Sequence, residues 1–160
     1  MKTRFLITSI CLFVVGSMSN AYAGAGAAGH EHSAYKFGQP GNPKKPSRVI
    51  EIKMTDSNGE MKFSPKAIEI KKGEQIKFKI RNIGELDHEV VIDTLPNNLK
   101  HAEEMMKNPD MEHDDPNAKR LGSKKSGEIV WLFNKPGTFD FSCLIPGHRE
   151  AGMTGKIVVR

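Results

Sequence analysis

The sequence FSCLIPGHREAGM, residues 141–153, brings a cysteine, a histidine and a methionine together near the end of the chain. Four residues separate Cys143 from His148, and four more separate His148 from Met153. A thiolate, an imidazole and a thioether on one short loop can converge on a single point. Soft sulfur favours Cu(I), imidazole accepts both copper states, and two His, one Cys and a weak axial Met form the trigonal type 1 set. The loop therefore predicts a copper site that needs one more histidine.

His88 is the best candidate for the second histidine ligand. It stands where the turn at residues 84–87 leads into a predicted strand, so the sheet can fix its side chain. Ligand histidines usually donate their other ring N–H to a partner. Asp87 is a candidate for tying the two ligand loops together, or else it is a simple turn residue. The predicted metal ligands are His88, Cys143, His148 and Met153, and no catalytic residue is predicted.

Short segments with strand character follow one another from residue 48 onwards. Apolar and polar residues alternate at 50–54 and at 76–81, which is typical of half-buried strands. Residues 61–65 are predicted to form a turn or bulge, and residues 135–137 a turn. Further strands are predicted at 67–71, 88–93, 127–134, 138–143 and 155–159. About seven short strands at this spacing predict an antiparallel β-sandwich.

Three stretches resemble the cupredoxin, or blue-copper, family: Asp87-His88-Glu89, residues 63–73 (FSPKAIEIKKG) and the loop 143–153. The resemblance covers about residues 48–160. It implies an all-β Greek-key sandwich of about seven to eight strands with one type 1 copper ion near one end. Residues 101–117 are similar to a subgroup of periplasmic cupredoxins linked to bacterial copper tolerance.

Other metal and catalytic sites fit the sequence less well. A dinuclear copper centre would need a second cysteine on the loop. A multicopper oxidase would place a histidine beside the cysteine, where this chain has Ser142 and Leu144. Structural zinc prefers more Cys or His ligands, and a Cys–His hydrolase gains no support from Met153 or from the strands. We therefore predict a redox protein and not an enzyme.

The first 23 residues are predicted to be a secretory signal peptide. Basic residues precede an apolar run at 5–15, and Ala21-Tyr22-Ala23 offers small residues for cleavage after Ala23. The run is too short for a membrane-spanning helix. We expect a periplasmic protein, with no membrane span after cleavage, whose single cysteine is Cys143. A lone cysteine in an exported protein invites oxidation unless something such as a metal occupies it.

Residues 24–47 are rich in Gly, Ala, Pro and Lys and are predicted to be a flexible leader without a packed core, before a domain at 48–160. Without the first 23 residues the chain has 22 basic and 19 acidic side chains, a net charge of +3. This charge is weak and dispersed, with no basic stripe interleaved with aromatic residues. We therefore expect no nucleic-acid binding. We also expect a monomer.

Residues 95–126 form a long polar insertion. Leu95, Leu99, Ala102 and Met106 lie at helical spacing, which predicts a short helix near residues 97–107 with Met106 as a core residue. A loop as long as the remainder is usually functional or disordered. Candidates for binding additional copper, or else for ordinary packing and solvation, are His30, His32, His101, Met105, Met111 and His113.

Two functions are compatible with these observations. A fixed Cys–His–His–Met site suits one-electron cycling between Cu(I) and Cu(II). The protein either serves copper tolerance, or it is a dedicated respiratory electron carrier with no role in copper resistance. The insertion and the subgroup resemblance favour copper tolerance. The apolar collar of Leu144, Ile145 and Pro146 beside His148 would suit docking of a periplasmic redox partner.

Overall fold

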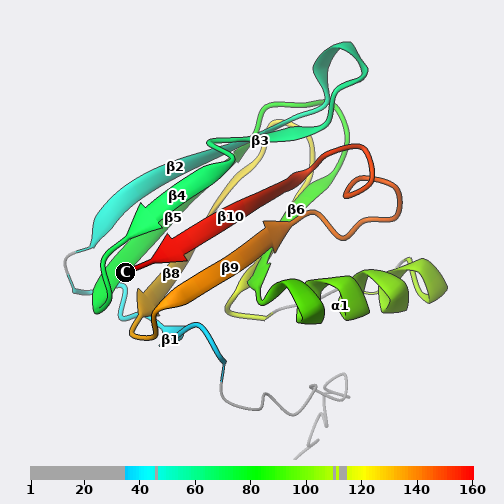
Figure 1. The fold of residues 1–160 in the computed structure, drawn as a ribbon. Coiled ribbons are helices and arrows are strands. Elements are labelled where there is room, and N and C mark those ends of the chain that lie inside the picture. Colours follow the sequence, from blue (N-terminus) through cyan, green and yellow to red (C-terminus); the bar gives the residue numbers. More distant parts are fainter. Residues whose placement is uncertain (1–34, 46, 110, 112–114) are drawn as a thin grey trace, which may run out of the picture. The chain divides into compact units, whose positions relative to one another are not determined.

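The computed structural model describes residues 35–45, 47–109, 111 and 115–160, which form two facing β-sheets and one α-helix (Figure 1). The first sheet has the order β1 (Gln39–Pro40), β8 (Ser126–Phe133), β5 (Glu74–Asn82), β2 (Arg48–Thr55) and β3 (Lys62–Ser64). The second has the order β4 (Ala67–Ile70), β10 (Thr154–Val159), β9 (Gly137–Ser142), β6 (His88–Asp93) and β7 (Ala118–Leu121). A 3-10 helix, η1 (Ser57–Gly59), follows β2, and α1 (Leu95–Lys107) follows β6. The predicted sandwich with one short helix in the insertion is confirmed.

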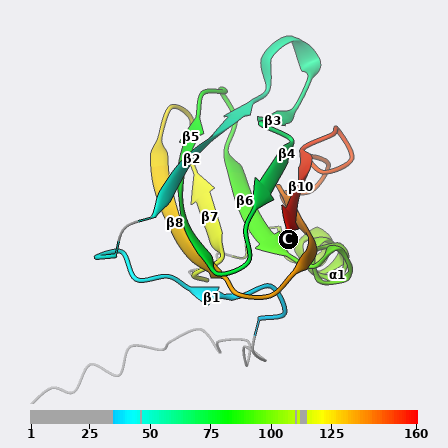
Figure 2. The same cartoon turned by 60° about the vertical axis from the view of Figure 1, so that its left-hand side comes forward.

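The strand pattern is richer than the sequence suggested. Short strands β1, β3 and β7 bring the number in the described residues to ten. Residues 62–64, expected in a turn or bulge, pair with β2 as β3, so that prediction was wrong. The sandwich is also not purely antiparallel, because β2 runs parallel to β5 and β4 runs parallel to β10. Figure 2 shows β2, β5 and β8 in one layer and β4, β6 and β10 in the other.

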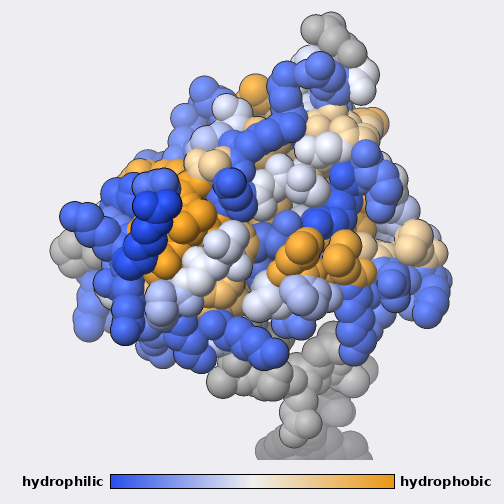
Figure 3. Space-filling view, in the orientation of Figure 1, coloured by the Kyte–Doolittle hydropathy of each residue, from blue (hydrophilic) through white to orange (hydrophobic). Residues whose placement is uncertain are grey.

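The core fills the space between the inner faces of the two sheets. Along β5 and β8 every second side chain is buried, and the register pairs Ile76 with Trp131 and Phe78 with Ile129. Burying a side chain of this size stabilises the fold by about 1.5–3 kcal/mol. On β5 the outer positions are polar, whereas on β8 they include Val130 and Leu132. The face drawn in Figure 3 is mostly hydrophilic with separate apolar areas. The alternation along β5 therefore predicted that strand correctly, because one of its faces packs in the core and the other faces water.

The end of the leader differs from the expected flexible segment. Phe37 is fully buried and stacks on Trp131 with ring centroids 4.7 Å apart. Strand β1 pairs with β8, which places Gln39 opposite Leu132. Tyr35 and Phe37 hold this segment against Trp131. The overall Gly, Pro and Lys content did not indicate this, because composition does not show which individual residues are buried. The predicted signal peptide at 1–23, together with His30, His32 and His113, lies outside the described residues.

Helix α1 has nearly the predicted bounds but turns a different face to the protein. The Thr94 side chain caps it by accepting a hydrogen bond from the Asn97 amide. Its buried residues are Asn98 and Met105, whereas Met106 is 61% exposed. The prediction that Met106 is a core residue was therefore wrong. The Asn98 side-chain amide donates to the Val91 carbonyl, and this polar anchor selects the buried face over the apolar spacing.

Candidate metal centre

Three elements from different parts of the chain position the predicted ligands at one end of the sandwich. His88 is the first residue of β6, and Cys143 directly follows β9. Strands β6 and β9 are antiparallel neighbours, with Val91 opposite Ser142, so the register brings the His88 end of β6 beside Cys143. His148 and Met153 lie on the loop that joins β9 to β10. Among the described residues, no helix has both the length and the apolar character needed to cross a membrane.

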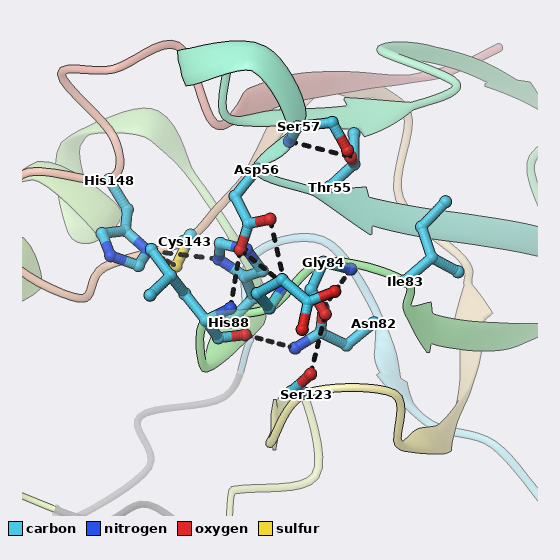
Figure 4. Close-up of polar contacts among 12 residues, drawn as sticks. Thr55, Asp56, Ser57, Asn82, Ile83, Gly84, His88, Ser123, Cys143 and His148 are labelled. Atoms are coloured by element: carbon cyan, nitrogen blue, oxygen red, sulfur yellow. Dashed lines mark hydrogen bonds and ion pairs between the residues drawn. The ribbon is translucent and has the colours of Figure 1, made fainter.

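The donor atoms of three predicted ligands converge (Figure 4). The Nδ1 atoms of His88 and His148 lie 3.2 Å apart, and the Cys143 Sγ lies 3.4 Å from the His148 Nδ1. One donor atom from each of these residues falls within 4.8 Å of the others. Within the described part of the chain this is the only such grouping of three or more His, Cys, Asp or Glu residues. The structure therefore brings three of the four predicted ligands, His88, Cys143 and His148, to one point.

Met153 closes the ligand loop. The Cys143 amide donates to the Met153 carbonyl at 3.1 Å, and the Met153 amide donates to the His148 carbonyl at 3.1 Å. Gly147 and Gly152 have φ angles of +85° and +101°, a backbone conformation that favours glycine. These bonds and turns hold Met153 in the same compact loop as Cys143 and His148, and its side chain is fully buried.

The donor set of the site suits a metal ion that takes both sulfur and nitrogen ligands, although the thiol must lose its proton on binding. Burial raises the pKa of the Cys143 thiol to about 12. Burial also lowers the pKa of His88 and of His148, so both imidazoles are neutral near pH 7 and each keeps a lone pair. Two neutral imidazoles, one cysteine and a nearby thioether are the donor set of type 1 copper. The group of His88, Cys143, His148 and Met153 is therefore consistent with a type 1 copper site.

Comparison with known proteins decides the family. Residues 50–160 match the model of copper binding proteins of the plastocyanin/azurin family. The chain belongs to this family. It is 42% identical to the copper-resistant cuproprotein CopI of Rubrivivax gelatinosus over the full length of both chains. It is 32% identical to the copper-resistant cuproprotein CopI of Pseudomonas aeruginosa, over 93% of this chain and 94% of that one.

Solved structures agree on the fold. Reduced auracyanin from Roseiflexus castenholzii superposes with a TM-score of 0.60 at 24% identity, over 72% of this chain and 99% of that chain. Auracyanin B gives a TM-score of 0.62 at 20% identity, over 78% and 96% of the two chains. The resemblance to cupredoxins seen in the ligand loop therefore extends to the whole sandwich.

Glu89 ties the two ligand segments together, a role for which the sequence had suggested Asp87. The Glu89 amide donates to the Cys143 Sγ at 3.5 Å, and the Glu89 side chain accepts from the Leu144 amide at 3.0 Å. Burial raises the pKa of Glu89, although the bond from Leu144 opposes this shift. The Asp87 side chain is instead exposed and pairs with Arg120 at 3.8 Å. The available signal for Glu89 was its charge directly before the apolar residues 90–92 of a predicted buried strand.

Asp56 is a second residue beside the predicted ligands that the sequence did not reveal. Its Oδ2 lies 3.2 Å from the His88 Nε2, across 32 residues of sequence. Burial opposes its ionisation, but hydrogen bonds from Leu86, Glu85 and His88 together hold the pKa of Asp56 below its usual range. No local sequence pattern marks Asp56, because the segment after β2 and His88 come together only in the folded protein.

A polar network fixes the loop next to His148. Arg149 donates to Asp140 at 2.9 Å, and the Asn98 amide of α1 donates to the same carboxylate at 2.8 Å. Ser142 bonds to both Asp140 and Arg149. The predicted insertion is therefore connected through Asn98 to the segment that carries the ligands.

Two of the candidates for additional copper binding, Met105 and Met111, pack inside the protein. Met105 is fully buried in a cluster with Val91 and Leu144. Met111 packs against that same cluster. For these two methionines the packing interpretation is therefore the better one.

Copper uptake is expected to release about one proton per ion near pH 7. The Cys143 thiol, with a pKa of about 12, is protonated in the copper-free protein, whereas a copper ligand must be a thiolate. The two histidines add no proton, because their lowered pKa values leave them neutral. The apparent copper affinity should consequently rise about tenfold per pH unit above pH 7.

The measurement is a copper titration in weak buffer with a pH indicator. Cys143→Ser serves as the control and should release no proton. Uptake by the wild type without proton release would mean that Cys143 is not a ligand.

Proposed function

We propose that the protein holds one copper ion through His88, Cys143, His148 and the axial ligand Met153, and cycles it between Cu(I) and Cu(II). The single observation that carries this proposal is the convergence of the two Nδ1 atoms and the Cys143 sulfur. A bound copper ion would supply the one-electron chemistry, and the protein supplies the ligands and their fixed positions.

The surroundings of the ligands favour electron transfer over catalysis on a substrate. His88, Cys143 and Met153 are fully buried, and only His148 is partly exposed. Strands β6 and β9 and the hydrogen-bonded loop restrain the ligands, so a change of copper charge requires little movement. The partly exposed His148 edge, beside Ile145 and the exposed Pro146, is the proposed contact for a redox partner. Leu144, which the sequence had placed in this collar, is buried and so does not belong to it. The protein is on this view an electron-transfer module and not an enzyme.

We propose that this redox site serves copper tolerance in the periplasm. Two relatives that align over more than nine-tenths of both chains are named as copper-resistant cuproproteins. The signal peptide predicted at residues 1–23 supports a location where copper ions are encountered before they reach the cytoplasm. The alternative is a respiratory electron carrier, which would use the same site without any effect on copper resistance.

Loss of the redox site should remove copper tolerance. In a strain that lacks the gene, the wild-type protein is expected to restore growth at rising copper concentrations, and Cys143→Ser is expected to fail. Sulfur is the ligand that makes the site selective for copper. Both proteins must be exported at equal abundance, which an immunoblot of the periplasmic fraction measures.

A second variant separates the site from the insertion. His101→Ala combined with Met106→Leu changes two possible copper donors on α1 and spares Met105, which is buried. If this variant protects as well as the wild type while Cys143→Ser fails, the copper site is sufficient. If Cys143→Ser also grows like the wild type, copper tolerance is excluded and the respiratory carrier remains.

A further inference from the structure

We propose that Asp56 is a positioning residue that sets the proton of His88 on Nε2 and strengthens the binding of Cu(II) relative to Cu(I). This inference rests on the proposed ligand set. Asp56 lies outside that set, and we infer that it controls the ligand His88 and, through His88, the reduction potential.

The two ring nitrogens of His88 face different surroundings. Its Nδ1 points to the convergence point, 3.2 Å from the His148 Nδ1. Its Nε2 points the other way, 3.2 Å from the Asp56 Oδ2 (Figure 4). The His88 side chain has no exposed surface and the Asp56 side chain is 8% exposed, so water has little access to this contact.

The backbone of the following turn holds the Asp56 carboxylate in place. The Leu86 amide donates to its Oδ2 at 2.7 Å, and the Glu85 amide lies 2.9 Å and 3.0 Å from its two oxygens. The carboxylate also approaches Gly84 so closely that a Cβ there would lie 2.7 Å from three of its atoms. The turn at residues 84–86 is therefore built around this carboxylate, immediately before the ligand His88.

The contact has a chemical consequence because a neutral imidazole carries a single N–H. A carboxylate can only accept a hydrogen bond, so the His88 proton belongs on Nε2 and the Nδ1 lone pair is left for the metal. A charged acceptor also makes the imidazole a stronger electron donor. Stronger donation favours the more highly charged Cu(II), and the reduction potential is lower than it would be with a neutral acceptor.

The test compares Asp56→Asn with Asp87→Asn. Both substitutions remove one negative charge near His88, but only Asp56 touches the ring, since the Asp87 side chain pairs with Arg120. Asn at position 56 keeps an oxygen for the Leu86 and Glu85 amides, so the turn can persist. We expect Asp56→Asn to weaken Cu(II) binding about 10–100-fold. Each tenfold loss not matched for Cu(I) raises the potential by about 59 mV.

Redox titration of the copper-loaded proteins measures the potential, and Asp87→Asn should shift it by less than half as much. Nitrogen-15 NMR of the copper-free wild type measures the tautomer directly and should place the His88 proton on Nε2. In Asp56→Asn the amide oxygen that keeps the Leu86 bond also faces Nε2, so the proton should stay on Nε2 and only the charge of its acceptor is lost. A purely structural role of Asp56 would leave the potential unchanged.

Two results would overturn the inference: equal potential shifts in the two variants, or a wild-type His88 protonated on Nδ1. The NMR measurement remains decisive even if Asp56→Asn fails to fold, because it uses the unmodified protein. Failure of the ligand set looks different, since the wild type itself would then bind Cu(II) without a cysteine-to-copper absorption band.

Discussion

Replacing Cys143 with Ser is expected to abolish the intense visible absorption of the oxidised, copper-loaded protein. That absorption arises when a thiolate sulfur donates charge to Cu(II), and a serine hydroxyl does not ionise to replace it. Cys143 is fully buried and its Sγ lies 3.4 Å from the His148 Nδ1, so the sulfur is positioned at the convergence point. The loss should be complete, because Cys143 is the free cysteine of the described residues.

An absorption spectrum recorded with equal amounts of added Cu(II) measures this effect. Met106→Leu is a matched control, since it removes a sulfur atom from a side chain that is 61% exposed and lies on α1. This control should keep the full band. A wild-type protein that binds Cu(II) without the band would show that the site is not type 1.

Removing the carboxylate of Asp140 should cost the copper-free protein about 3–5 kcal/mol of unfolding free energy. Asp140→Ala leaves Arg149 without its ion pair, and that side chain is only 13% exposed. The Asn98 amide of α1 loses an acceptor at the same time. Three elements, namely α1, β9 and the ligand loop, are therefore weakened together by one substitution.

Urea unfolding followed by the fluorescence of the buried Trp131 measures this loss. The matched control is Glu60→Ala. It breaks the ion pair between the exposed side chains of Glu60 and Lys62, whose charged atoms lie 2.6 Å apart. Exposed pairs contribute little because water and salt screen them. Equal losses in the two variants would contradict the structural role of the Asp140 network.

The Asp140 network also explains how the insertion contributes to the site. Because Arg149 directly follows His148, its pairing with Asp140 restrains the backbone next to a ligand. Asn98 extends that restraint to α1. The insertion thus supports the proposed copper site through a polar contact. Met106 of α1 is exposed, so the growth test can change it without disturbing the core.

The sequence by itself determined what depends on neighbouring residues. Cys143, His148 and Met153 share one loop, so their spacing alone restricted the metal and the family. The alternation along residues 76–81 indicated a strand, since each side chain sees either the core or water. These features are local, and they survive any arrangement of the remaining chain.

Only the tertiary structure decided how the distant groups meet. His88 and His148 are 60 residues apart, and the orientation that turns both Nδ1 atoms to one point follows from the pairing of β6 with β9. Asp56 reaches His88 from another strand end, across 32 residues. The buried face of α1 was likewise set by Asn98 bonding to Val91 and Asp140, against the apolar spacing of the helix. A buried hydrogen bond depends on a partner that the local sequence does not contain, and so no periodicity could have predicted these contacts.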